Sequence, residues 1–343
     1  MTLEDFKRIF LWEWSHRILG RFIGVFFVLP ALYFSMRRGM TTSATRWKLL
    51  AIGAGIGFQG FLGWFMVASG LKNPYENEGK SDRPDWYPRV DHFRLAAHLG
   101  AAFLVYMGML YSAVGILRDA GLVRSMRSSG GADQTSALTT LLTQLQNPKT
   151  RAFRRTTLGM LGLVFTTAIY GAFVAGLDAG LLYNEFPTMG GPDRLLPPKD
   201  ELIDPRYRFR GDAPQQDPSC HQVVLGNLLQ NPVTVQAVHR GLGISTLLSM
   251  IGYLVYSKRL KSVLPRAAPR FATGAAHMTV LQALLGIGTL VYMVPIPLAS
   301  LHQGGSVVVL SMLTCVLGVL RRPGRALEAL ARARDAAKHA ARV

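Results

Sequence analysis

The sequence is poor in cysteine and in acidic residues, and both shortages exclude classes of protein. Its 343 residues contain two cysteines, Cys220 and Cys315, which lie far apart, so neither a disulfide framework nor a CxxC site is indicated. Acidic residues number 20 against 38 lysines and arginines, giving a formal charge of +18. The basic residues gather in short clusters between apolar runs instead of following exposed elements, which argues against nucleic-acid binding.

Long apolar runs dominate the rest of the chain. Crossing ~30 Å of hydrocarbon takes about 20 helical residues, and seven runs reach that length. The runs lack strict two-residue alternation, so we expect helices and not the strands of a membrane barrel. The sequence therefore predicts an all-α polytopic membrane protein in a lipid bilayer, without a cleavable signal peptide or an Arg-rich transit peptide. The predicted spans are approximately 16–36, 48–70, 93–117, 156–177, 234–256, 271–294 and 297–320.

Positive charge is concentrated in alternate connections. The segments after the first, third and fifth runs are basic, whereas residues 71–92 and 178–233 contain more acids than bases. Because Lys and Arg are enriched in loops on the cytoplasmic or matrix side, we predict that the basic loops face that side and that the N-terminus faces the other.

The chain contains an internal repeat. The segment "EWSHRILG" at 13–20 returns as "QAVHRGLG" at 236–243, and "AHLGAA" at 97–102 matches "LHQGGS" at 301–306. Such parallel duplication predicts two tandem pseudo-symmetric helix bundles, with three helices in the first and four in the second. The predicted parts are an N-terminal half at 1–118, a basic-side linker loop at 119–155, a C-terminal half at 156–320 and a basic C-terminal tail at 321–343.

Each half contributes two histidines at the starts of predicted helices, on the side with the acidic loops. They pair as His16 with His98 and as His239 with His302. Two imidazoles on facing helices at one depth are what bis-histidine ligation of a heme iron requires. Arginines follow His16 and His239 directly and could pair with heme propionates. The alternative is that these histidines only form hydrogen bonds between helices.

The two halves differ by one carboxylate. Glu13 lies three residues before His16, on the same helical face, and its counterpart before His239 is Gln236, which cannot be charged. A carboxylate at membrane depth is a candidate for a catalytic role, either stabilising a developing cation or acting as a general base. The alternatives are a favourable position at a helix N-terminus or an ion pair with Arg17.

The motifs EWSHR, FRLAAHLG, GAFVAGLDAGLLYNEFPTMG, VQAVHRGLG and LASLHQGGS resemble those of the heme A synthase family. The resemblance extends from about Phe6 to Leu320 and is to the mitochondrial and alphaproteobacterial type, which lacks a cysteine pair in its first outer loop. It implies an oxidoreductase that oxidises a methyl substituent of heme O to the formyl group of heme A for cytochrome c oxidase. It also implies a mitochondrial inner membrane or a bacterial plasma membrane.

The resemblance also implies residue roles and partners. His239, His302 and Arg240 would bind a resident heme b, whereas His16, His98 and Arg17 would bind the substrate heme, with the four histidines as axial iron ligands. Glu13 would be the catalytic carboxylate. Heme O synthase and assembly factors of cytochrome c oxidase are the implied partners; the electron-transfer partner and a homo-oligomer are left open. Segment 176–190 either covers a heme edge or forms a structured loop where a helix ends.

Three further hypotheses come from the repeat. A duplicated four-helix unit predicts eight helices in a complete family member, so we expect that this chain lacks the first transmembrane helix. Either the gene model is shortened or the chain is an inactive truncated form. A diheme b-type cytochrome would use the same four histidines for electron transfer alone. A transporter built on parallel repeats would need a charged midplane site beyond these positions.

Overall fold

The computed structural model describes residues 2–37, 39–70, 89–128, 132–209, 220–324 and 327, and the regular elements in these ranges are helices. The chain divides into two compact units, Met1–Tyr106 and Met107–Val343, and the division falls within one long helix, α3 (His92–Ser128). Each unit is described by itself below.

Seven of the described helices are long and apolar enough to span a membrane, which confirms the prediction of an all-α, multi-pass membrane protein. Each of them overlaps a run predicted from the sequence, and most extend further at one or both ends. The spans are Ile9–Met36, Ser43–Gly70, His92–Arg124, Pro148–Gly176, Pro232–Arg259, Ala267–Val291 and Ile296–Val319.

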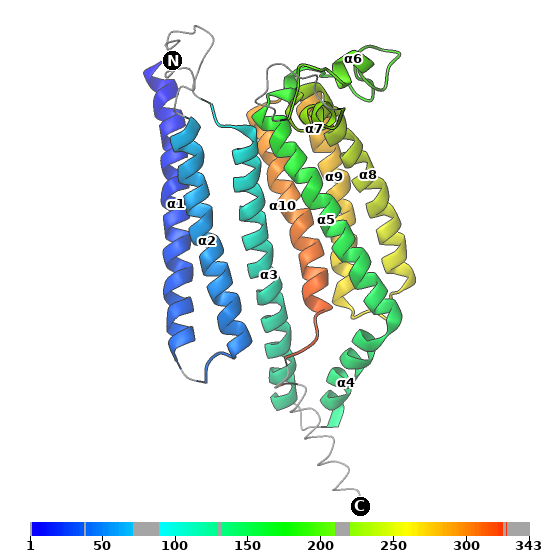
Figure 1. The fold of residues 1–343 in the computed structure, drawn as a ribbon. Coiled ribbons are helices and arrows are strands. Elements are labelled where there is room, and N and C mark those ends of the chain that lie inside the picture. Colours follow the sequence, from blue (N-terminus) through cyan, green and yellow to red (C-terminus); the bar gives the residue numbers. More distant parts are fainter. Residues whose placement is uncertain are drawn as a thin grey trace, which may run out of the picture. The chain divides into compact units, whose positions relative to one another are not determined.

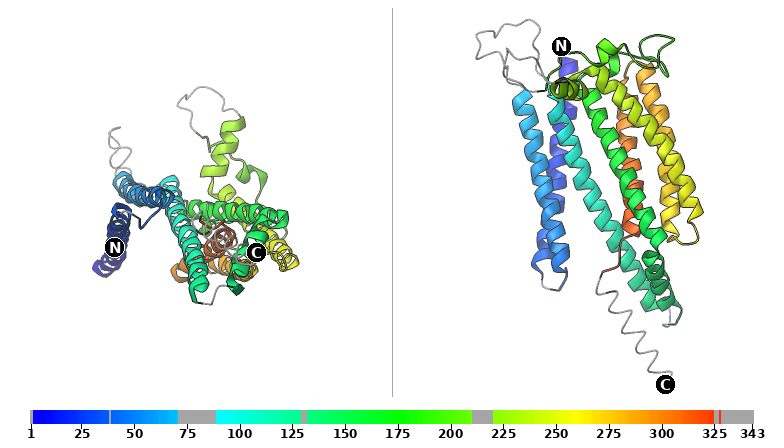
Figure 2. Two further views of the ribbon diagram at one scale, coloured as in Figure 1. Left: turned by 90° about the horizontal axis from the view of Figure 1, so that it is seen from below. Right: turned by 45° about the vertical axis from the view of Figure 1, so that its right-hand side comes forward.

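The first unit consists of α1 (Leu3–Met36), α2 (Ser43–Gly70) and the start of α3. The helices α1 and α2 lie side by side (Figures 1 and 2). The hydroxyl of Thr42 accepts a hydrogen bond from the Thr45 amide at 3.2 Å, which caps the start of α2. A Cβ added at Gly55 of α2 would lie 2.7 Å from Val105 of α3, so the absence of a side chain there lets these two helices approach closely.

The second unit is built around α5 (Pro148–Gly176), α8 (Pro232–Arg259), α9 (Ala267–Val291) and α10 (Ile296–Val319), which lie side by side in Figures 1 and 2. Hydroxyls join α5 to α8 inside the bundle: Thr157 bonds to Tyr253 at 2.8 Å and Thr167 to Thr246 at 3.0 Å. In hydrocarbon such groups need partners within the protein. The fully buried core includes Met250, Leu310, Leu313 and Val316.

Residues 119–155, expected to form a loop, are mostly helical, so the expectation is wrong about their secondary structure. The helix α3 continues to Ser128, α4 covers Ala132–Gln146, and α5 begins at Pro148. The side chain of Asn147 accepts a hydrogen bond from the Lys149 amide at 2.9 Å and caps α5, where Pro148 suits the first helical position. In α4, three leucines at helical spacing are buried among polar neighbours: Leu138, Leu141 and Leu145.

An arginine–aspartate cluster joins the end of α10 to the second part of α3, within the second unit. Arg118 forms an ion pair with Asp119 at 2.7 Å and donates a hydrogen bond to the carbonyl of Val319 at 2.9 Å. Arg321 contacts the other carboxylate oxygen of Asp119 at 3.2 Å. A Cβ at Gly115 would lie 2.6 Å from the Arg321 guanidinium, so this glycine leaves room for the cluster. Most of the predicted basic tail at 321–343 lies outside the described residues.

Candidate functional site

The second unit brings His239 and His302 together. Asn231 caps α8 by accepting from the Val233 amide at 3.0 Å, which places His239 two turns into the helix. His302 lies at a similar depth in α10, whose first turn follows Pro295. The two ring centroids are 6.4 Å apart and the ring planes meet at 87°.

The first unit brings His16 and His98 together in the same way. Asp91 caps α3 by accepting from the amides of Phe93 and Arg94, each at 3.1 Å, so His98 also lies two turns into its helix. Its partner His16 is in α1. The ring centroids are again 6.4 Å apart, and the ring planes meet at 74°.

The ring separation in both pairs suits a metal held between two imidazoles. A metal about 2 Å from each ring nitrogen holds those nitrogens about 4 Å apart, and the ring centroids then lie roughly 6 Å apart. The 6.4 Å observed in each unit matches that value. The residues therefore fit axial ligation of a heme iron, for which two histidines suffice.

Glycines line three of the four rings closely. A Cβ at Gly63 of α2 would lie 2.9 Å from Cε1 of His98, and one at Gly286 of α9 would lie 2.9 Å from Cε1 of His302. These two glycines are counterparts in the repeat, 47 residues after His16 and His239 respectively. Gly171 of α5 plays the same part for His239, where the distance would be 3.2 Å. The histidines are thus held against neighbouring backbones, which fixes their positions.

The protonation of His239 is set by a backbone carbonyl. Its Nδ1 lies 3.1 Å from the carbonyl oxygen of Thr167, which can only accept a hydrogen bond. The proton is therefore on Nδ1, and Nε2 carries the lone pair that a metal needs.

Arg240 binds the segment that follows α5. Its Nη1 donates to the carbonyls of Glu185 at 2.9 Å and Thr188 at 3.0 Å, and its Nη2 donates to the carbonyl of Tyr183 at 2.7 Å. Gln236, one turn earlier, donates to the same Tyr183 carbonyl at 3.0 Å. That Arg240 binds a heme propionate stays a prediction; in this structure its two terminal guanidinium nitrogens hold a loop.

Glu13 and Arg17 form an ion pair on α1, one turn apart, and each side chain is 50% exposed. The counterparts Gln236 and Arg240 do not bond to each other and instead both reach Tyr183. The carboxylate that distinguishes the first half is thus held by the arginine that follows the histidine, one turn from the His16–His98 pair.

The segment from 177 onward is a structured loop at the end of the bundle. Glu185 accepts hydrogen bonds from the amides of Gly190 and Gly191, and both glycines have positive φ, at 96° and 123°. Asn184 donates to the Leu290 carbonyl of α9 at 2.8 Å. This supports the structured-loop interpretation of 176–190. A cavity of about 500 Å³ lies beside the loop, lined by Leu182, Tyr183, Asn184, Glu185, Gly190, Gly191, Pro198 and Glu201.

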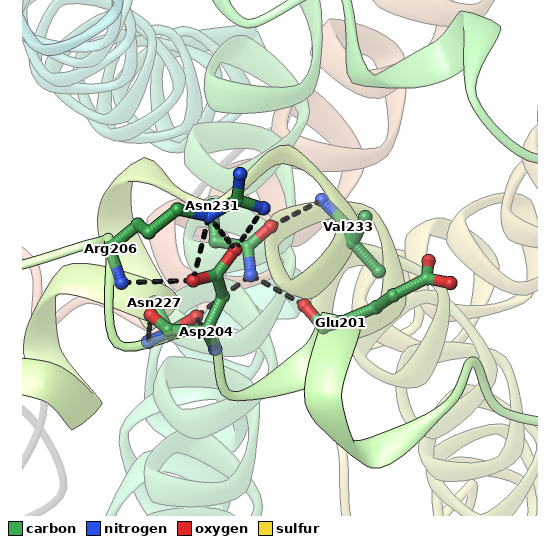
Figure 3. A network of polar contacts seen from close by, with 6 residues as sticks. All are labelled: Glu201, Asp204, Arg206, Asn227, Asn231 and Val233. Atoms are coloured by element: carbon green, nitrogen blue, oxygen red, sulfur yellow. Dashed lines mark hydrogen bonds and ion pairs between the residues drawn. The ribbon is translucent and has the colours of Figure 1, made fainter.

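A polar network fastens the next part of the loop to the start of α8 (Figure 3). Asn227, in α7 (Cys220–Gln230), accepts from the Asp204 amide at 2.9 Å and from the Asn231 side chain at 2.8 Å. The Asn231 side chain also donates a hydrogen bond, at 2.7 Å, to the carbonyl of Glu201, which lies in α6 (Lys199–Leu202). Hydrogen bonds from Arg206 hold the pKa of the Asp204 carboxyl below its usual value. The Glu201 carboxylate, also in α6, accepts a hydrogen bond from Tyr183 and raises the pKa of that phenol to about 12.

Sequence reasoning found the four histidines but not the groups that hold them. Gly63 and Gly286 could have been found from the repeat, because both lie at the same distance from the first histidine of their half. The carbonyl of Thr167 and the loop carbonyls bound by Arg240 could not have been found, because every residue type has a backbone carbonyl.

The fold and the site define a class: a multi-pass membrane protein of two related halves, each with one apposed pair of histidines. The model of one family, COX15-CtaA, described as cytochrome oxidase assembly protein, matches residues 1–314. The chain belongs to this family.

Named relatives agree with this assignment. The chain is 39% identical over 314 residues to the heme A synthase–mitochondrial ferredoxin fusion protein of Schizosaccharomyces pombe, covering 91% of this chain and 47% of the relative. It is 38% identical to heme A synthase COX15 of Saccharomyces cerevisiae, covering 94% and 62%. It is 36% identical to heme A synthase of Rhodospirillum centenum, covering 94% and 71%. The chain thus spans less than two thirds of the length of the two yeast relatives.

Proposed function

We propose that this chain is a heme A synthase, an oxidoreductase that oxidises a methyl substituent of heme O to a formyl group. Support comes from membership of the COX15-CtaA family and from the names of the relatives. The observation that carries the proposal is the equal separation of the two histidine pairs, 6.4 Å in each unit, together with a carboxylate, Glu13, one turn before His16 where the second half has Gln236.

The two pairs then take different roles. His239 and His302 hold a resident heme b, and Nε2 of His239 is free for the iron because Thr167 binds Nδ1. A heme in that place supplies one-electron transfer. His16 and His98 bind the substrate heme O and orient it relative to Glu13.

Glu13 acts on the substrate from one turn before His16. A carboxylate there stabilises positive charge that develops at the oxidised carbon, or accepts its proton. Arg17 holds the carboxylate by its ion pair and restricts its position. Gln236 in the second half has the shape of Glu13 without the charge, which explains why only the first half would react.

The proposal includes a location and partners. The protein belongs in a mitochondrial inner membrane or a bacterial plasma membrane, with the basic connections on the matrix or cytoplasmic side. In the second unit, α4 and the α8–α9 connection lie at the end opposite α6 and α7 (Figure 1). A heme O synthase would supply the substrate, and assembly factors of cytochrome c oxidase would receive the product.

The test separates the two sites. Glu13→Gln should abolish heme A formation while the absorbance of the low-spin heme in the second unit stays unchanged, because Glu13 belongs to the first unit. The matched control is Glu4→Gln, which removes an exposed carboxylate near the start of the same helix and should leave heme A formation above half of the wild-type rate. Normal heme A output from Glu13→Gln would remove this residue from the mechanism.

A second test addresses the histidines. His239→Ala or His302→Ala should remove the low-spin bis-histidine spectrum of the second unit, whereas His277→Ala, an exposed histidine elsewhere on α9, should not. If the spectrum is unchanged in both His239→Ala and His302→Ala, the assignment of heme b to this pair is wrong. The protein can also be supplied with heme O and a reductant. If it then shows two intact heme spectra but forms no heme A, the result would favour a diheme cytochrome that only transfers electrons.

A further inference from the structure

Two glutamines related by the repeat lie next to the second histidine of each pair. Gln59 in α2 and Gln282 in α9 each lie four residues before the glycine that contacts the ring, Gly63 or Gly286. Residues four apart share a helical face, so each glutamine faces the same helix as that glycine. The two glutamines nevertheless have different partners.

Gln59 is bonded to its histidine. Its amide nitrogen donates to the backbone carbonyl of His98 at 2.9 Å, which identifies that atom as nitrogen. The same nitrogen is 3.1 Å from Nδ1 and 3.3 Å from Nε2 of the ring, so its second proton can bond to whichever ring nitrogen carries the lone pair. The amide oxygen is buried without a hydrogen-bond partner among the described residues.

The side chain of Gln282 forms no hydrogen bond to the His302 ring among the described residues, and Nδ1 of that ring is likewise without a hydrogen-bond partner there. The Gln282 amide nitrogen is buried without a hydrogen-bond partner in the part of the chain that the structure describes. The amide nitrogen lies so close to Gly305 that a Cβ added at that glycine would overlap with it. In the aligned segments "AHLGAA" and "LHQGGS", the counterpart of Gly305 is Ala101, which has that Cβ. The position taken by Gln282 is therefore closed to Gln59, and Gln59 turns to His98.

This difference bears on how firmly each histidine can bind iron. A neutral imidazole has a single lone-pair nitrogen, and a hydrogen bond from an amide N–H and a bond to iron both need that lone pair. We propose that Gln59 is a positioning residue that competes with iron for His98, so that the first site releases its heme while the second retains it. The space at Gly305 lets the Gln282 amide pack there without bonding to the His302 ring. No amide then competes with iron for His302, and this ligand stays bound. The inference rests on the proposed function, in which a substrate heme must leave the first site and heme b must stay in the second.

The experiment measures heme release instead of activity. The full chain in detergent, loaded with hemin, is mixed with excess apomyoglobin, and transfer is followed by absorbance. We expect a fast phase that disappears in His16→Ala and a slow phase that disappears in His239→Ala. Gln59→Met keeps the length of the side chain without the donor, and should slow the fast phase about fivefold, the equilibrium value of one hydrogen bond.

Two matched substitutions exchange the small residues. Ala101→Gly opens the alternative position to Gln59 and should slow the fast phase, whereas Gly305→Ala displaces Gln282 toward His302 and should speed the slow phase. The three atoms nearest to the Cβ of the second variant belong to the ends of the Gln282 and Met278 side chains, which can move, so the fold should be retained. Two phases whose rates do not respond to these variants overturn the inference alone. A chain with no histidine-dependent phase contradicts the proposed function, and the inference with it.

Discussion

Replacing Arg240 by methionine should release the loop at 183–188 from the start of α8. The substitution removes three hydrogen bonds from a charged donor to main-chain carbonyls, at 2.7, 2.9 and 3.0 Å. Each such bond contributes about 1.5–3 kcal/mol, but the three bonds are only partly buried, and the carbonyls can bind water once the loop opens. We therefore expect a loss of about 2–3 kcal/mol in loop docking, well below the sum of the three.

Amide hydrogen exchange measures this loss directly. The amides of Gly190 and Gly191 bond to Glu185 inside the loop, so their exchange reports on opening. A loss of about 2–3 kcal/mol should speed their exchange roughly 30- to 150-fold. The control is Arg17→Met, since Arg17 pairs with Glu13 in the other unit. Exchange within threefold of the wild type in Arg240→Met would show that the arginine does not hold the loop.

The remaining predictions concern ring contacts and acid stability. Gly286→Ala should weaken the low-spin absorbance of the second unit, because the new methyl group would lie 2.9 Å from His302. The control is Gly288→Ala, whose methyl group would lie 3.9 Å from Leu298 and should leave the absorbance unchanged. Equal spectra for the two variants would refute the contact with His302. The pKa of Asp204 is lowered in the folded state by Arg206, so its contribution to stability is present above the ordinary pKa of about 4 and is lost as pH falls through the lower folded value. Asp204→Asn should therefore lower the midpoint of thermal unfolding at pH 7 and flatten the decline of that midpoint below about pH 4. Both effects should be modest, because the Arg206 side chain is exposed. An unchanged dependence of the midpoint on acid pH would show that the Asp204–Arg206 ion pair does not stabilise the fold.

The sequence predicted the spanning helices because length and hydropathy alone decide whether a segment can cross hydrocarbon. It predicted the four histidines because duplication repeats a rare residue at a fixed place. The sequence did not predict α4. Its three buried leucines are outnumbered by polar residues such as serine, threonine and glutamine, so the apolar pattern of the helix is weak. The sequence could not give the partners of Arg240 and Gln59, since these depend on how each helix is rotated and on a single methyl group at position 101.

Four side chains along the start of α8 bind the loop that precedes it through main-chain oxygen atoms. Asn231 donates to the Glu201 carbonyl, Thr234 to the Leu202 carbonyl, and Gln236 and Arg240 to the Tyr183 carbonyl. Every residue type has a carbonyl, so this mode of attachment places little demand on side-chain identity in the loop. In a saturation mutagenesis screen, loop positions that meet α8 through their carbonyl alone, such as Thr188 and Leu202, should therefore accept many residues, whereas the four positions on α8 should accept few.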